Sequence, residues 1–310
     1  MKARRKAPTL RAASEYEIGE WMSGKPLVHG FKLGRNVLIE RHFRGQDRAA
    51  GEKLLAGRPG LAGKTVICVV SFNVPWIIEL LLGSAGRLAN SAFIIFDNSR
   101  DPEARRQIER ICREADTAYL SLPANPERHP CRSHGLSMNW AYYNVIEPLR
   151  PRVFGFFDHD LIPIAPYDPA AALGDQPVYG VLNHSPWGWN LWAGFSLFDF
   201  ARFSVFRPDF NHDVPRHLDT GGRNWRSVYR HLDRSKIRFA ELERIQIKDP
   251  MFDVPSDAQL IDGALLHMSG VGHGVKRYPP VRPEFYLAMF RRLAAGGSLA
   301  EFRPPPASAA

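Results

Sequence analysis

Two aspartates interrupt an otherwise apolar stretch, residues 153–164, which reads VFGFFDHDLIPI. Burying Asp158 and Asp160 without a partner would cost more than a short strand can return. Their i, i+2 spacing places both side chains on one side of an extended segment. Carboxylate oxygens are ligands that Mg²⁺ and Mn²⁺ prefer, and such a cation can bridge them to a diphosphate. We therefore expect a divalent-cation site here; an acid pair that caps a nearby loop is the alternative.

Strand-like and helix-like segments alternate before this pair. Apolar runs at 64–72, 91–99, 117–123 and 152–160 are typical of buried strands, and the segments between them have helical spacing. This alternation predicts an α/β fold with a mostly parallel central sheet and helices on both faces. Ligands of such sheets bind beyond the carboxyl ends of the strands. Three of those ends read SFN, FDNS and FDHD, which predicts a polar ligand site there.

Two common nucleotide-binding motifs are disfavoured. Residues 58–65, RPGLAGKT, approach a P-loop, but Arg58 replaces its first glycine and the segment precedes its strand instead of following it. The stretch SFNVPW after that strand has none of the glycines of a G-x-G-x-x-G dinucleotide fingerprint. The ligand is therefore not expected to bind through either motif.

Composition narrows the partners and the compartment. The net charge of +9 favours a polyanionic partner, but no RNP-type or zinc-finger pattern supports a specific nucleic acid. Cys68, Cys112 and Cys131 form no CxxC pair, which indicates a reducing compartment. We find neither a spanning apolar run nor the apolar core of a secretory signal. We expect a cytoplasmic protein, and peripheral contact with the inner face of the membrane stays open.

The order of the motifs SFNVP, FDNS followed by Asp101, SHGLSMN and DHD resembles the nucleotide-sugar glycosyltransferases of the GT-A fold, particularly family 2-like enzymes. The resemblance covers roughly residues 64–275. It implies a GT-A-like, Rossmann-like domain that moves a sugar from a UDP- or GDP-type donor to an acceptor hydroxyl, with inversion, in glycan or polysaccharide synthesis. It also implies Mn²⁺ or Mg²⁺ as cofactor and a glycan or lipid-linked acceptor.

The resemblance assigns the nucleotide to residues after the first two strands. The residues expected to line the base pocket are Ser71, Asn73 and Pro75. Asp97 would face the base or the ribose, while Asn98 and Ser99 shape its turn.

The resemblance also assigns the metal site. Asp160 would be the more direct metal ligand, Asp158 would contact the ribose or the metal, and His159 between them should point away. A histidine after a late strand often adds a ligand; His267 fits that place best and His273 is the second choice, with a purely structural histidine as the alternative. The basic residues that would neutralise the departing diphosphate are Lys276 and Arg277.

Three tryptophans lie close together in NHSPWGWNLWAGFSLF. Aromatic faces can stack on sugar rings, and Trp187 and Trp189, flanked by turn residues, are the favoured contacts. The segment WAGFSLF resembles the one that lies under the donor and acceptor sugars in these transferases, which implies roles for Trp192 and Gly194. Core packing is the alternative for Trp192.

A single carboxylate precedes two glycines in HLDTGGRNW. An inverting transferase needs one general base near the acceptor hydroxyl, and Asp219 is the candidate. A helix N-cap is the alternative for this residue. The chain lacks the clear Glu-Asp pair that many inverting members use, so three other carboxylates remain rivals: Asp199, Asp209 and Asp213.

The chain divides into three predicted parts. Residues 1–60 form an N-terminal extension and linker with one strand-like run, NVLIE at 36–40; residues 61–285 form the catalytic domain; residues 286–310 form a helix and a disordered tail. Two other functions stay open. A sugar-phosphate nucleotidyltransferase would normally carry a Gly-rich, basic loop where SFNVPW stands, and a non-enzymatic glycan- or polyanion-binding module would need neither aspartate of the DHD motif.

Overall fold

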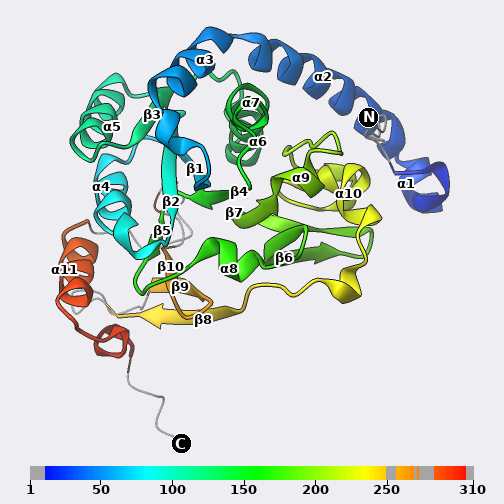
Figure 1. The fold of residues 1–310 in the computed structure, drawn as a ribbon. Coiled ribbons are helices and arrows are strands. Elements are labelled where there is room, and N and C mark those ends of the chain that lie inside the picture. Colours follow the sequence, from blue (N-terminus) through cyan, green and yellow to red (C-terminus); the bar gives the residue numbers. More distant parts are fainter. Residues whose placement is uncertain (1–10, 249–255, 269–270, 272–282, 305–310) are drawn as a thin grey trace, which may run out of the picture.

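The computed structural model describes residues 11–248, 256–268, 271 and 283–304. At its centre lies a six-stranded sheet in the order β3-β2-β1-β4-β7-β6 (Figure 1). Its strands are β1 (Thr65–Ser71), β2 (Ser91–Asp97), β3 (Ala118–Ser121), β4 (Val153–Asp158), β6 (Val178–Ser185) and β7 (Gly188–Asp199). The first four pair in parallel, and β7 runs antiparallel between β4 and β6. The predicted α/β fold with a mostly parallel sheet is confirmed.

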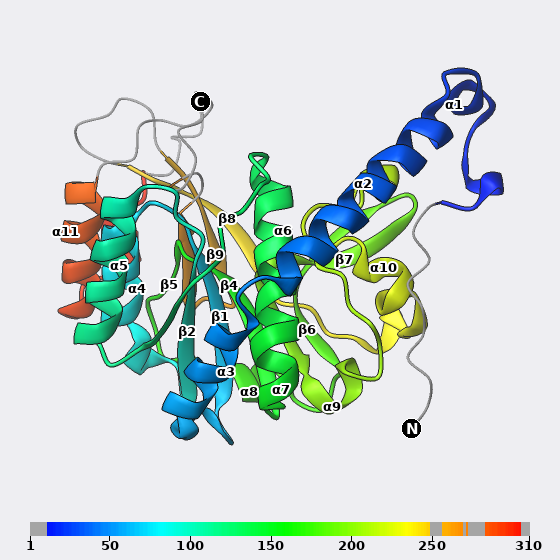
Figure 2. The same ribbon diagram turned by 90° about the horizontal axis from the view of Figure 1, so that it is seen from above.

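Helices cover both faces of this sheet, as predicted (Figure 2). On one face lie α4 (Pro75–Gly83) and α5 (Pro102–Glu114); on the other, α6 (Pro130–Ala141) continues through a π-helical turn (Tyr142–Ile146) into α7 (Glu147–Leu149). The alternation of β1 divides the core: Ile67 packs toward α4, and Cys68 toward α6. Proline at the first position starts α4 and α5 directly after the strand-end loops, so polar strand ends face one edge of the sheet.

A second, four-stranded sheet adjoins the first. Its order is β5-β10-β9-β8 and all its pairs are antiparallel. Its strands are β5 (Leu161–Pro163), β8 (Leu242–Ile247), β9 (Ser256–Ile261) and β10 (Leu265–Met268). Only two residues separate β4 from β5, so the DHD motif lies where the chain leaves one sheet and enters the other.

The remaining helices surround these sheets. They are α1 (Ile18–Met22), α2 (Lys25–Gly45), α3 (Arg48–Gly57), α8 (Pro169–Leu173), α9 (Phe200–Phe203), α10 (Asn224–Ser227) and α11 (Pro283–Ala294). The strand predicted at 36–40 is wrong, because these residues lie inside α2. Ile39 and Phe43 are four residues apart, and both pack into the core as one helical face. None of the helices in the described ranges has both the length and the apolar character needed to cross a bilayer.

The C-terminal prediction is partly outside the described residues. A helix does follow the second sheet, but α11 begins at Pro283, before the predicted boundary at 286. The tail predicted to be disordered includes residues 305–310, which lie outside the described ranges.

Candidate metal centre and pocket

Three side chains that can ligate a metal converge where the two sheets meet. Asp158 ends β4, Asp160 precedes β5, and His267 lies on β10 beside β5. One ligand atom from each side chain lies within 4.8 Å of the others. His267 Nε2 is 3.2 Å from Asp160 Oδ1 and 3.9 Å from Asp158 Oδ2. The structure thus brings together the three residues expected to hold a metal, which we call the acid–histidine cluster.

The two aspartates converge through a turn, not through strand alternation as predicted. His159 and Asp160 form a turn between β4 and β5, so the segment is not extended there. His159 lies in this turn and, although largely buried, is among the residues that line the pocket beside its two neighbours. The backbone of Asp160 is fixed by the Met268 amide, which donates to its carbonyl over 3.1 Å.

Hydrogen bonding and charge define the state of His267. Its Nδ1 lies 3.2 Å from Gln259 Oε1, an atom that only accepts, so Nδ1 donates and Nε2 faces the carboxylates. Burial alone would lower the pKa of His267, but Asp160 and Asp158 raise that pKa above its ordinary value. Burial would raise the pKa of Asp160, whereas His267 holds it below the ordinary value. The raised pKa of His267 favours an imidazolium beside these carboxylates when no cation is bound.

The acid–histidine cluster also fits a divalent cation. Two carboxylates and an imidazole are a donor set that Mn²⁺ accepts, and a cation would displace the Nε2 proton of His267. Metal-ligating histidines usually donate their other ring N–H to an oxygen, as His267 does to Gln259. The side chain of Asp158 is 25% exposed, which leaves one side of the cluster open to a ligand.

A pocket of about 710 Å³ opens beside the cluster, at the carboxyl ends of β1 and β4. We call it the carboxyl-edge pocket. Its walls also come from α6, β6, β7 and the second sheet. Its position agrees with the rule that ligands of parallel sheets bind beyond the carboxyl ends of the strands.

Of the six residues predicted to surround the nucleotide base and ribose, Asn98 lines this pocket. Its side chain is buried, and Nδ2 donates to Ser133 Oγ over 2.9 Å. Its Oδ1 is buried with no hydrogen-bond partner among the described residues. An unpaired buried acceptor is costly, and a ligand donor that reached this oxygen would offset that cost.

In this structure Asp97 does not line the carboxyl-edge pocket, and its contact with the base or ribose stays a prediction. Asp97 is fully buried and its oxygens are occupied by protein donors: Ser99 N and Ser71 Oγ on Oδ1, and Tyr119 Oη on Oδ2, 2.8, 3.3 and 2.9 Å away. Ser71 and Ser99, which donate two of these bonds, do not line the pocket either.

Asn73 and Pro75 likewise shape the strand-end loops instead of lining the pocket. Asn73 Oδ1 accepts from the amides of Arg100 and Asp101, which ties the loop after β1 to the loop after β2. Pro75 is the first residue of α4.

Trp192 and Gly194 lie at the cluster. Trp192 lines the pocket, and its ring packs edge-on against His267 with centroids 4.7 Å apart. A Cβ at position 194 would overlap the Trp192 ring and lie 2.5 Å from Asp158 Oδ2. Glycine at 194 is therefore what lets Trp192 and Asp158 occupy their positions.

The other two tryptophans, Trp187 and Trp189, lie in different environments. Trp189 is 4% exposed, packs against Tyr229 with centroids 4.8 Å apart and does not line the pocket, so its predicted contact with sugar stays a prediction. Its ring belongs to the core because β7 turns that side chain toward α10. Trp187 is partly exposed at the β6–β7 turn and stacks on His217, which lines the carboxyl-edge pocket.

Asp219 is exposed and lines the pocket, in contrast to its rivals. Its carboxylate accepts from the Thr220 amide and does not cap α10, which begins at Asn224. The rivals are occupied elsewhere: Asp199 caps α9, Asp209 pairs with Arg223, and Asp213 pairs with Arg216. A thiol nucleophile is disfavoured, because burial and Asp219 raise the pKa of the nearby Cys131 to about 12.

Sequence reasoning missed several basic and polar side chains of the pocket. Arg128 and Arg244 line it, and Arg244 pairs in register with Gln259, which pairs with His267. The Asp-Gly turn at 262–263 was a usable hairpin signal for the last pair. Arg244 offered no local signal. The predicted diphosphate contacts Lys276 and Arg277, and the alternative ligand His273, lie outside the described residues.

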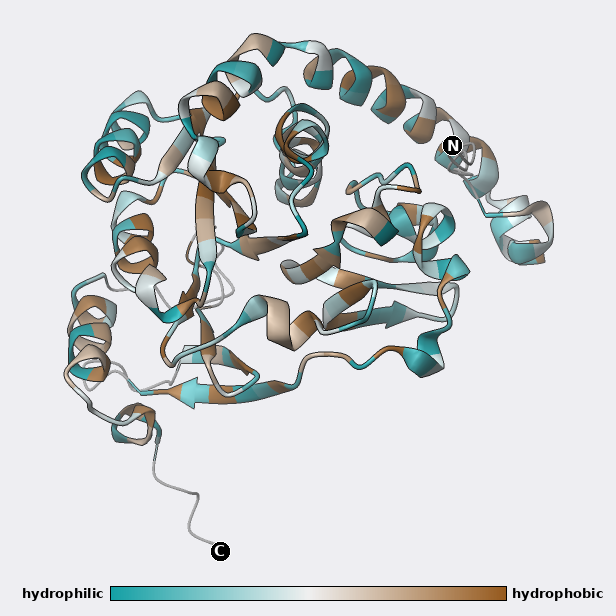
Figure 3. Cartoon of the chain, viewed as in Figure 1, coloured by the Kyte–Doolittle hydropathy of each residue, from teal (hydrophilic) through white to brown (hydrophobic). Residues whose placement is uncertain are grey.

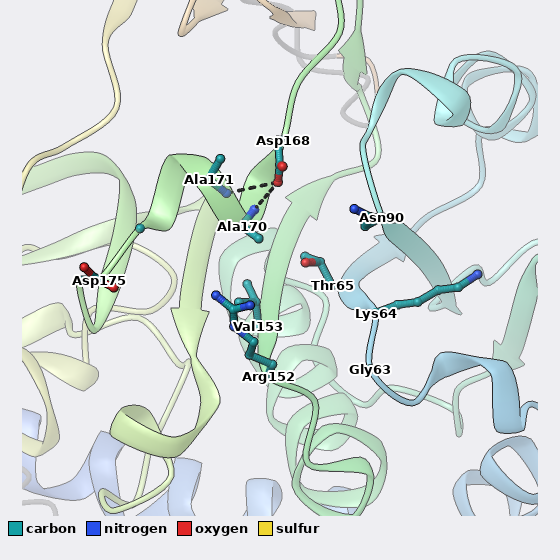
Figure 4. Close-up of a pocket in the computed structure, with 11 residues that line it drawn as sticks. Gly63, Lys64, Thr65, Asn90, Arg152, Val153, Asp168, Ala170, Ala171 and Asp175 are labelled. Carbon is teal, nitrogen blue, oxygen red and sulfur yellow. Dashed lines mark hydrogen bonds between the residues drawn. The ribbon is translucent and has the colours of Figure 1, made fainter.

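A second pocket, of about 540 Å³, lies at the opposite edge of the sheet, near the starts of β1 and β4 (Figure 4). Its charged side chains include Lys64, Arg152 and Asp175. Asp168 there caps α8 by accepting from the amides of Ala170 and Ala171. In the described part of the chain, the metal-ligand group found is the acid–histidine cluster, so the chemistry gathers at the carboxyl edge.

No protein-family model matches the chain, and no curated protein matches its sequence. Among solved structures, the chain is similar to the mannosyltransferase PcManGT from Pyrobaculum calidifontis in complex with GDP-Man and Mn²⁺, at 11% identity and a TM-score of 0.34. The match covers 49% of this chain and 56% of that chain, so this chain spans little more than half of its neighbour. A likeness this remote leaves function to the chemistry of the site.

Proposed function

We propose that the chain is a metal-dependent glycosyltransferase that moves a sugar from a UDP- or GDP-type donor to a hydroxyl of a glycan or lipid-linked acceptor, with inversion. The observation that carries this proposal is the convergence of Asp158, Asp160 and His267 beside the carboxyl-edge pocket. A pocket of about 710 Å³ is large enough for a nucleotide-sized ligand.

The lining of the pocket supports an anionic, hydrogen-bonding ligand. Arg128 and Arg244 are exposed cations on its walls, suited to a diphosphate. Asn98 Oδ1 supplies an acceptor for an N–H or O–H of the base or ribose. Trp192 supplies an apolar ring face beside the cluster for the sugar.

The chemistry divides between the two sides of the pocket. Asp158, Asp160 and His267 would hold Mn²⁺ or Mg²⁺, which when bound offsets the negative charge of the diphosphate leaving group. Asp219 would accept the proton of the acceptor hydroxyl as its oxygen bonds to the anomeric carbon and the bond from that carbon to the phosphate oxygen breaks.

The test is a thermal-shift panel of UDP, GDP, CDP, ADP and dTDP, each with and without Mn²⁺. We expect one diphosphate to raise the melting temperature only with metal, by several degrees at about a hundred times its Kd. Asp160→Asn should abolish the shift, whereas Asp175→Asn, an exposed aspartate at the opposite pocket, should keep it. Stabilisation by no diphosphate would contradict the proposal.

The same thermal-shift assay, extended to nucleoside triphosphates, separates the other two functions. A sugar-phosphate nucleotidyltransferase would be stabilised by a nucleoside triphosphate and would release pyrophosphate. A glycan- or polyanion-binding module would respond to neither nucleotide nor metal, and Asp160→Asn would leave its binding unchanged.

A further inference from the structure

Exposed apolar side chains concentrate on the N-terminal helices. Among the described residues, ten large hydrophobic side chains are exposed, and seven of them lie between residues 18 and 38. These seven are Ile18, Trp21, Met22, Leu27, Val28, Phe31 and Leu38. Leu27 is 80% exposed and Phe31 is 76% exposed. A gathering of this kind on one part of a surface usually marks an interaction site.

The helical period aligns the three most exposed of those on α2. Leu27, Phe31 and Leu38 lie at i, i+4 and i+11, so they form one stripe along α2. A different side of α2 carries Ile39 and Phe43, which pack into the core. Figure 2 shows the N-terminal part of α2 running outward from the body with α1 at its end, and Figure 3 shows brown segments along it. No described residue is packed over the stripe.

The charge along α2 beside this stripe is mainly positive, with Glu20 of α1 3.6 Å from the Lys25 ammonium and Glu127 2.8 Å from Arg35. From Trp21 to Ile39 the sequence contains no acidic residue, while Lys25, Lys32 and Arg35 are basic. All three basic side chains are exposed. A second copy of the chain would bring these like charges together, whereas an anionic surface complements them. Apolar side chains bordered by Lys and Arg, with a tryptophan nearby, are typical of helices that lie in a membrane interface.

We propose that α1 and α2 form a membrane-binding face that lies on an anionic lipid surface. Leu27, Phe31 and Leu38 insert among the upper acyl chains, and Lys32 meets the phosphate headgroups. Binding through this face does not depend on the proposed transferase activity, so the two can fail separately.

Co-sedimentation with vesicles tests this proposal. We expect the full chain to bind vesicles that contain phosphatidylglycerol better than vesicles of phosphatidylcholine alone, and to lose that preference at high salt. The double variant Leu27→Ser with Phe31→Ser should lower the partition coefficient by roughly tenfold or more. Lys32→Glu should reduce only the preference for the anionic lipid.

The matched control is Val205→Ser with Val214→Ser, two exposed apolar side chains elsewhere on the molecule. It should bind as the unchanged chain does, and thermal melting should show that both double variants are folded. Equal partitioning of the stripe variant and the control would overturn the proposal. Light scattering that shows a dimer, dissolved by the stripe substitutions, would assign the face to a second copy instead.

Discussion

Gly194 has no side chain, and this leaves the space that the Trp192 ring and the Asp158 carboxylate occupy. Any Cβ there meets the Trp192 ring and the Asp158 carboxylate. Asp158 Oδ2 also lies 3.9 Å from His267 Nε2, so a shift of this oxygen opens the acid–histidine cluster. Precision at a metal site depends on such supporting positions as much as on the ligands.

Gly194→Ala therefore tests the cluster without removing a ligand. We expect metal affinity, measured by Mn²⁺ titration, to fall by roughly tenfold or more, since supporting positions commonly have effects of this size. Gly86→Ala is the control, because nothing lies within 4 Å of a Cβ at that position. Unchanged Mn²⁺ affinity in folded Gly194→Ala would show that the metal binds elsewhere.

Asn98 provides a second test at the scale of one residue. Its Nδ2 is held by Ser133, so Oδ1 is presented in a defined direction. We expect Asn98→Ala to weaken diphosphate binding by about tenfold, the value of one hydrogen bond, while Mn²⁺ binding without nucleotide is unchanged. Calorimetry measures both. Full nucleotide affinity in this variant would leave Oδ1 without a role in recognition.

Asp219 should affect turnover and not binding. As the proposed base it acts only on the acceptor hydroxyl, so Asp219→Asn should lower kcat by about 10²- to 10⁴-fold. The metal-dependent thermal shift with the diphosphate should persist, in contrast to Asp160→Asn. Loss of that shift would assign Asp219 to donor binding.

At the scale of elements, the loop that carries Asp219 is connected to α6 by the half-buried carboxylate of Asp209. Asp209 Oδ1 accepts from Asn139 Nδ2 on α6 and from the Asn211 amide, each over 3.0 Å. Its Oδ2 lies 3.2 Å from Arg223 Nη1. The position of this wall of the pocket thus depends on one ionised side chain.

Acid should loosen this connection. Burial alone would raise the pKa of Asp209, but Arg223 and the amide donors hold it below its ordinary value. Such a carboxyl stabilises the fold above its unfolded pKa, and this contribution is lost as pH falls through the folded pKa. We expect the free energy of unfolding to drop between about pH 5 and pH 2. In Asp209→Asn part of this drop should be missing, whereas Asp175→Asn should retain it in denaturation curves.

The sequence predicts secondary-structure elements well where a buried segment appears as a long apolar run. Strands β1, β2 and β4 read as apolar runs because they are covered on both faces, and their order with the helices follows. The strand predicted for NVLIE, residues 36–40, was wrong because a run of five residues fits a strand and a helix equally well. The packing of Ile39 and Phe43 on the body selects the helix, and that packing cannot be seen in the sequence. The turn at His159 could not be predicted from the sequence because the apolar run of β4 continues in β5, which belongs to the second sheet.

At the scale of the whole molecule, the site joins segments that are distant in the chain, and this limits what the sequence can predict. Asp158 and Asp160 carried a local signal. Asp97 looked equally promising, but Tyr119 on β3 occupies it. Trp189 packs into the core against Tyr229, and no motif links the two segments that make this contact. Residues whose role depends on such distant contacts cannot be ranked from spacing alone.

The membrane-binding face and the carboxyl-edge pocket also belong to one body. Arg35 on α2 binds Glu127 over 2.8 Å, and Glu127 lines the pocket. A membrane-bound enzyme would therefore hold the pocket near lipid headgroups, where a lipid-linked acceptor is concentrated. For such an acceptor on vesicles, Leu27→Ser with Phe31→Ser should lower turnover by roughly tenfold or more.

The turnover of the stripe variant is measured as the rate at which nucleoside diphosphate is released. Transfer to a water-soluble acceptor analogue, and hydrolysis of the donor, should be unchanged in the stripe variant, because the substitutions lie outside the pocket. An equal loss with both acceptors would instead mean that α2 supports the pocket wall through Arg35. Unchanged turnover with both, in a variant that no longer binds vesicles, would mean that the acceptor reaches Asp219 from solution.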